Sequence, residues 1–208
     1  MSTTTSGEPA TGPTPRAPRD LGSASSAERA SPLVVGVVAW LASELMFFGG
    51  LFAAWFVLRA NNEPNWPPAG EELDVWRMAV FTAVLIASSF TIHRAVICAE
   101  QGNKVASIRW LSLTVVMGLA FLVNEALEWA SLDFSFSSSA FSTIFYLLTG
   151  FHGAHVLAGL ILMTVVAWVV FSPGSKSPPG EGLKVTSYYW HFVDVVWSVL
   201  FLVVYVIQ

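Results

Sequence analysis

Charged residues and cysteine are both scarce in this sequence. Asp, Glu, Lys and Arg make up 12% of its 208 residues, whereas a soluble domain carries about 25%. The net charge of -4 is thinly spread, so the composition gives no indication of a nucleic-acid-binding surface. The single cysteine, Cys98, excludes an intrachain disulfide and any site that needs paired thiolates, such as a binuclear copper centre.

Apolar residues are correspondingly abundant. They account for 54% of the chain, and the mean hydropathy is +0.62, which is typical of a membrane protein. Five apolar stretches each provide the ~20 residues that a helix needs to cross a bilayer core. The sequence therefore predicts an all-α polytopic membrane protein, a bundle of five transmembrane helices. The expected spans are about residues 33–58, 75–99, 108–130, 140–171 and 186–207, and the Pro- and Gly-rich segment 172–180 is expected to break helix.

Residues 1–30 differ in composition from the rest of the chain. Ser, Thr, Pro, Ala and Gly dominate, and Leu21 is the only large aliphatic residue after Met1. Such a segment buries too little apolar area to offset its ordering entropy, so we expect a disordered tail. It lacks the short apolar core of a signal peptide. Residues 31–208 are expected to form one transmembrane domain, which opens with the N-cap and proline of Ser31-Pro32.

The basic residues predict the orientation of the chain. If the five spans alternate, eight of the ten Lys and Arg residues fall on the side of the tail. Only Arg59 and Arg77 fall on the other side. Because cytoplasmic segments carry the excess of Lys and Arg, the N-terminus and tail are expected in the cytoplasm and the C-terminus outside.

A carboxylate lies near the middle of the first span. Glu44 follows Ser43 within an apolar run, and an ionised carboxylate in hydrocarbon is costly unless it finds a partner. One interpretation is a carboxyl that exchanges protons. The other is a protonated glutamate that forms a structural hydrogen bond with a neighbouring helix.

Two further acidic residues, Glu125 and Glu128, share a helix face near the outer end of the third span. They are too few for a carboxylate-bridged di-iron site, which needs ligands from four helices. We therefore favour a polar cluster that receives a Trp, Tyr or His donor over a pair of metal ligands.

Histidines lie in the last two spans. His152 and His155 are three residues apart in the fourth, and His191 and Asp194 repeat that spacing in the fifth. Asp194 is expected to orient His191 or to balance its charge. Three histidines are enough for a zinc or copper site, but the depths expected for His152 and His191 differ. We therefore expect structural roles for all four residues and no metal site.

Four signals occur in order along the chain. They are Ser43-Glu44 with its following aromatic residues, Glu125-x-x-Glu128, the string from Gly150 to Val156, and the string from Tyr188 to Trp197. Together they resemble subunit III of the haem–copper cytochrome oxidases, over about residues 33–208. The family pattern has seven helices, and the first two have no counterpart here. Five-helix forms occur in the family.

The resemblance implies a non-redox subunit of an aerobic respiratory cytochrome c oxidase in a bacterial plasma membrane. Haem and copper are expected in the partner subunits I and II. This subunit is expected to support assembly, stability and sustained proton uptake. By resemblance, Glu44 is the carboxyl that reacts with carbodiimides. The resemblance is also compatible with bound phospholipid and with a small additional subunit in place of the missing first two helices.

Other functions stay open at this point. The chain is also compatible with subunit III of a quinol oxidase or with an accessory protein of nitric oxide reductase, which shares the last motif. A transporter or proton channel that uses Glu44, His152 and His155 is a different class. The sequence lacks the inverted repeat and broken helices that transporters often show.

Overall fold

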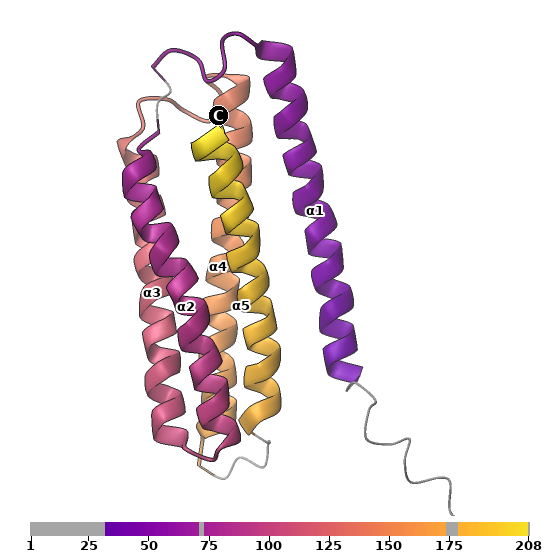
Figure 1. Ribbon diagram of the computed structural model, residues 1–208, viewed down its shortest axis with the longest axis vertical. Coiled ribbons are helices and arrows are strands. Elements are labelled where there is room, and N and C mark those ends of the chain that lie inside the picture. Colours follow the sequence, from indigo (N-terminus) through magenta and orange to yellow (C-terminus); the bar gives the residue numbers. More distant parts are fainter. Residues whose placement is uncertain (1–31, 71–72, 174–178, 208) are drawn as a thin grey trace, which may run out of the picture.

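The computed structural model describes residues 32–70, 73–173 and 179–207, and all regular secondary structure in these segments is helical (Figure 1). All five helices are long and apolar enough to cross a membrane. The prediction of a five-helix membrane protein is thus confirmed, while the predicted tail at residues 1–30 lies outside the described segments. The helices are α1 (Pro32–Asn62), α2 (Val75–Glu100), α3 (Lys104–Ser131), α4 (Ala140–Phe171) and α5 (Pro179–Phe201), which continues as the π-helical segment η1 (Leu202–Ile207).

Polar side chains define the starts of the middle helices. The side chain of Asp74 caps α2, and that of Asn103 caps α3. Ser139 forms a reciprocal capping box with Ser142 at the start of α4. These caps satisfy backbone N–H groups that have no partner within the helix. Between α2 and α3, Gly102 has a φ of +77°, a conformation that glycine adopts without strain.

Helix α5 begins earlier than expected, at Pro179 instead of residue 186. We interpreted the Pro- and Gly-rich segment as a helix breaker. A proline at the first helical position, however, loses no hydrogen bond, and Glu181 in the first turn suits the helix dipole. Lys184 also reaches Glu100 of α2, with 3.6 Å between Nζ and Oε1. As a consequence, His191 lies about three turns from the start of α5.

Helices α2–α5 form a four-helix bundle, and α1 lies along one side of it (Figure 1). The α2–α3 turn, the end of α4 and the start of α5 lie at the end of the bundle where α1 starts, and the end of η1 lies at the opposite end. Helix α1 contacts α4 and α5. Only 6% of the residues in its most apolar 18-residue stretch are buried, whereas in the corresponding stretch of α5 the share is 50%. The core is therefore built around α5, and α1 depends on a small number of contacts.

The centre of the bundle is closed by Trp190 of α5, whose side chain is fully buried. Its ring lies between two glycines of neighbouring helices. A Cβ atom at Gly118 of α3 would lie 2.8 Å from Trp190 Cη2, and one at Gly159 of α4 would lie 2.9 Å from Cε3. The missing side chains therefore allow three helices to approach one another around the indole ring.

This packing generates a stability prediction. We expect Gly118→Ala and Gly159→Ala each to cost about 1–3 kcal/mol, because the added methyl overpacks the core against Trp190. Gly49→Ala in α1 is the matched control, since no atom lies within 4 Å of its added Cβ. Thermal unfolding and retention of the chain in the purified membrane complex would measure the effect. Equal stability of all three variants would contradict the described packing.

Candidate functional site

Glu44 of α1 meets His155 of α4. Glu44 Oε2 lies 3.2 Å from His155 Nε2, and His155 Nδ1 lies 2.7 Å from the carbonyl oxygen of Phe151. The two side chains are largely buried, at 23% and 17% exposure. The sequence presented both residues as mid-membrane polar groups without indicating that they are partners. The pair fits the expectation that Glu44 bonds to a neighbouring helix.

The second bond of His155 determines how the pair holds protons. A carbonyl oxygen only accepts hydrogen bonds, so His155 Nδ1 must carry a proton. The Nε2–Oε2 contact then contains one further proton, which resides either on the imidazole or on the carboxyl of Glu44. Both states retain the hydrogen bond. Release of this proton to a third group would leave a carboxylate facing an unprotonated Nε2, so the hydrogen bond between α1 and α4 would be restored only when the proton is replaced.

Aromatic side chains surround the Glu44–His155 pair. Trp40 of α1 stacks on Tyr189 of α5, with ring centroids 5.3 Å apart. Tyr189 Oη donates to the carbonyl oxygen of His155 at 3.0 Å, and the Phe48 ring contacts the His155 ring edge-on. An open hollow of about 350 Å³ is lined by Trp40, His155 and Tyr189 among others. His155 is therefore accessible from outside the bundle.

A second polar group joins α2 and α5. Ser89 Oγ lies 2.9 Å from His191 Nδ1, and it donates a hydrogen bond to Asp194 Oδ2. We predicted that His191 and Asp194 interact directly, but the structure joins them through Ser89. Residues three apart on one helix face the same neighbour, and that neighbour supplies the hydroxyl. Ser89, a hydroxyl residue inside the apolar second span, was the feature of the sequence that could have indicated this bridge.

The two acidic residues of α3 have different surroundings. Tyr205 Oη donates to Glu128 Oε2 at 3.0 Å, so tyrosine is the donor to Glu128 among the Trp, Tyr and His side chains that were considered. Glu125 is 4% exposed, and its Oε1 has no hydrogen-bond partner in the described segments. Nearby, Arg77 Nε donates to Asn124 Oδ1 at 2.8 Å. Sequence reasoning did not anticipate this contact, although Arg77 is basic and lies inside the second span.

The remaining histidines do not join a common site. His152 is fully buried between the rings of Phe121 and Trp197, and neither of its ring nitrogens bonds to a described group. His93 is exposed near the end of α2, as expected for an interfacial residue. No three His, Cys, Asp or Glu side chains among the described residues could hold a metal ion. Elemental analysis of the isolated chain remains the test of the predicted absence of metal.

Fold and polar residues together define a multi-pass membrane subunit with an intramembrane carboxyl–imidazole pair. The family model for cytochrome c oxidase subunit III matches residues 22–208. The probable cytochrome c oxidase subunit 3 of Mycobacterium tuberculosis is 45% identical over 188 residues, which cover 88% of this chain and 92% of the relative. The Nocardia farcinica protein of the same name is 43% identical with the same coverage.

A third relative extends the comparison. The cytochrome c oxidase subunit 3 of Thermostichus vulcanus is 37% identical over 175 residues, or 84% of this chain and 87% of the relative. The chain belongs to the cytochrome c oxidase subunit III family. The resemblance seen in the four sequence motifs is thereby confirmed.

The Ser89 bridge can be tested by mutation. We expect Ser89→Ala to lower the free energy of unfolding by about 1–3 kcal/mol, because Asp194 and His191 lose the hydroxyl that they share inside the bundle. Asp194→Ala should also lower retention of the chain in the complex, whereas Asp194→Asn keeps an oxygen that accepts from Ser89. Ser112→Ala, at an exposed position of α3, is the control. Thermal stability of the purified complex is the measurement, and a Ser89→Ala variant as stable as the control would contradict the bridge.

Proposed function

We propose that this chain is the non-redox subunit III of an aerobic cytochrome c oxidase and supports assembly and sustained proton uptake by the catalytic subunit. The observation that carries the proposal is the Glu44–His155 pair, in a chain of the subunit III family. Each relative described above is named as a cytochrome c oxidase subunit. This favours the cytochrome c type over a quinol oxidase subunit or a nitric oxide reductase accessory protein.

The pair supplies a proton reservoir at mid-membrane. Glu44 lies about three turns from the start of α1, and its partner His155 faces an open hollow. The shared proton can leave toward a neighbouring subunit from either partner, and a replacement proton then restores the hydrogen bond. The neighbour's uptake route then receives protons at a steady rate over many turnovers. The redox chemistry itself takes place in the partner subunits I and II, which hold haem and copper.

The exposed surface of α1 supports an assembly role. Met46 is 80% exposed, and Leu45, Phe56 and Val57 are also exposed. An apolar helix face of this kind requires lipid or protein against it. We assign this face to contact with bound phospholipid or with another oxidase subunit. That subunit can be a small one that takes the place of the two helices that the five-helix form lacks. The location is the bacterial plasma membrane.

The proton role predicts a specific kinetic defect. Glu44→Gln in the purified oxidase should leave the initial rate of oxygen consumption nearly unchanged and should shorten the time over which activity persists. Gln keeps a hydrogen bond to His155 but cannot exchange the proton. Oxygen consumption followed until it decays is the measurement. Glu63→Gln, an exposed glutamate at the end of the same helix that pairs with Arg59, is the matched control.

An essential role of Glu44 predicts a much larger loss of oxygen-consumption rate in Glu44→Gln. Loss of an essential proton donor costs about 10²–10⁴-fold in rate. An immediate loss of that size, with haem content unchanged, would place Glu44 on the essential proton path and contradict a supporting role. If Glu44 and His155 act as a unit, His155→Gln should shorten the time over which activity persists to a similar extent. The double variant should then show no further loss, as non-additivity requires for a coupled pair.

The charge pattern predicts the orientation. In a Cys98→Ala background, Gln101→Cys in the α2–α3 turn should react only with a thiol reagent supplied from the cytoplasm. Ser138→Cys in the α3–α4 connection should react only from outside. Both positions are exposed, and the basic residues Arg94, Lys104 and Arg109 cluster around the first of them. Labelling of both cysteines from the same side would contradict the five-span topology.

A further inference from the structure

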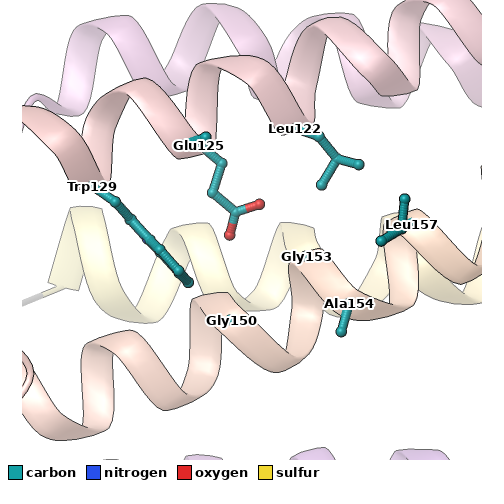
Figure 2. A pocket seen from close by; sticks show the side chains of 8 residues that line it. Leu122, Glu125, Trp129, Gly150, Gly153, Ala154 and Leu157 are labelled. Atoms are coloured by element: carbon teal, nitrogen blue, oxygen red, sulfur yellow. The ribbon is translucent and has the colours of Figure 1, made fainter.

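A groove runs between α3 and α4 on the outer surface of the bundle. Its volume is about 250 Å³. Figure 2 shows Glu125 pointing from α3 into this space toward Gly153 of α4, with Leu122 and Leu157 near one end and Trp129 at the other. We call it the α3–α4 groove. Apart from Glu125, its lining is almost entirely apolar.

Glu125 is the unusual residue of this groove. It is 4% exposed, and its Oε1 has no hydrogen-bond partner in the described segments. A Cβ atom at Gly153 would lie 2.8 Å from its Oε2, so the carboxyl fills the notch that the glycine leaves. Glu128, one turn away, has Tyr205 as its donor. A buried carboxyl with an unpartnered oxygen is costly, so a hydrogen-bond donor brought to this carboxyl by an occupant of the groove would stabilise it.

The chemistry of the occupant follows from its surroundings. It must be mainly apolar to match the lining, and it must carry one hydrogen-bond donor at the level of Glu125. A lipid acyl chain has no such donor. Glu125 lies about two turns from the end of α3, and the Trp129 ring lies between Glu125 and that end. A Cβ at Gly150 would lie 3.1 Å from Trp129 Cη2, so the ring reaches α4. It closes the groove toward the membrane–water interface at the end of α3.

The Trp129 ring therefore separates a lipid headgroup at that membrane surface from Glu125. The hydrogen-bond donor must reach Glu125 from the lateral face of the bundle. Ala126 of α3 and Ala154 of α4 line the groove and are both small and exposed, which allows another helix to approach closely. We propose that the α3–α4 groove docks a transmembrane helix of another subunit of the oxidase, and that this helix places a Ser, Thr or Tyr hydroxyl on the Glu125 carboxyl. The inference rests on the proposed function, since it requires the chain to be part of that complex.

Photo-crosslinking in the intact purified oxidase tests this proposal. The photoreactive residue p-benzoylphenylalanine replaces Leu157, which lines the groove and is 50% exposed. In a control complex it replaces Phe90 of α2, which is 71% exposed. We expect the first complex alone to give an adduct with a transmembrane peptide of a different subunit, identified by mass spectrometry. Adducts with phospholipid only, adducts with a second copy of this chain, or no adduct would each overturn the proposal.

Variants of the groove test the role of the carboxyl. Glu125→Ala should reduce the Leu157 adduct about tenfold, which corresponds to the loss of a buried hydrogen bond, whereas Glu125→Gln keeps an acceptor and should retain it. Equal yields in both variants would contradict the hydrogen bond. Ala126→Leu is a second variant that obstructs the groove from its exposed side and should lower the yield. Ala83→Leu, at an exposed position of α2, should not.

The two proposals fail in different ways. Co-purification of the chain with the haem-containing subunits, without a groove adduct, would contradict the docking site and leave the proposed function standing. Absence of the chain from the haem-containing complex would contradict the proposed function itself.

Discussion

Hydrogen bonds between side chains of α2 and α5 are the contacts on which the rest of the bundle depends. In a bilayer, lipid is as apolar as the helix surfaces, so packing and polar contacts, and not apolar burial, select helix neighbours. The indole nitrogen of Trp190 donates to Ser88 Oγ at 2.8 Å, and that of Trp197 donates to Thr82 Oγ1 at 2.9 Å. Ser89 adds a third contact through His191 and Asp194. These bonds fix the rotation of α5, and the two indole rings then fill the centre of the bundle.

Once α5 is fixed, it positions the groups used by the other helices. Tyr205 reaches Glu128 of α3, and Tyr189 reaches the backbone of α4 at His155. Trp40 of α1 stacks on that same Tyr189. The weakly packed α1 is therefore attached where Glu44 meets His155, and this pair is one of the few polar contacts that join α1 to the bundle. The proposed proton exchange and the attachment of α1 thus depend on the same contact.

Much of this arrangement could be predicted from the sequence, because bilayer thickness sets the length of each span and each polar residue inside a span needs a partner. The five helices, and the need of Glu128 for a side-chain donor, follow from those two rules. Depth is only one coordinate, however, and it leaves helix rotation and neighbours undetermined. For that reason the sequence did not indicate that His155 faces Glu44, or that Ser89 lies between His191 and Asp194. The early start of α5 was missed because Pro179 was taken as a breaker and not as a first helical residue.

The central claim is that Glu44 and His155 share one proton that exchanges during turnover. Infrared difference spectroscopy of the purified oxidase, comparing the oxidised and reduced states, tests it most directly, because a protonated carboxyl has its own C=O stretching band. The account predicts a carboxylic acid band that changes between the two states, is absent in Glu44→Gln and is shifted in His155→Gln. A wild-type spectrum identical to that of Glu44→Gln in this region, or a Glu44 band that His155→Gln leaves unchanged, would contradict the shared proton.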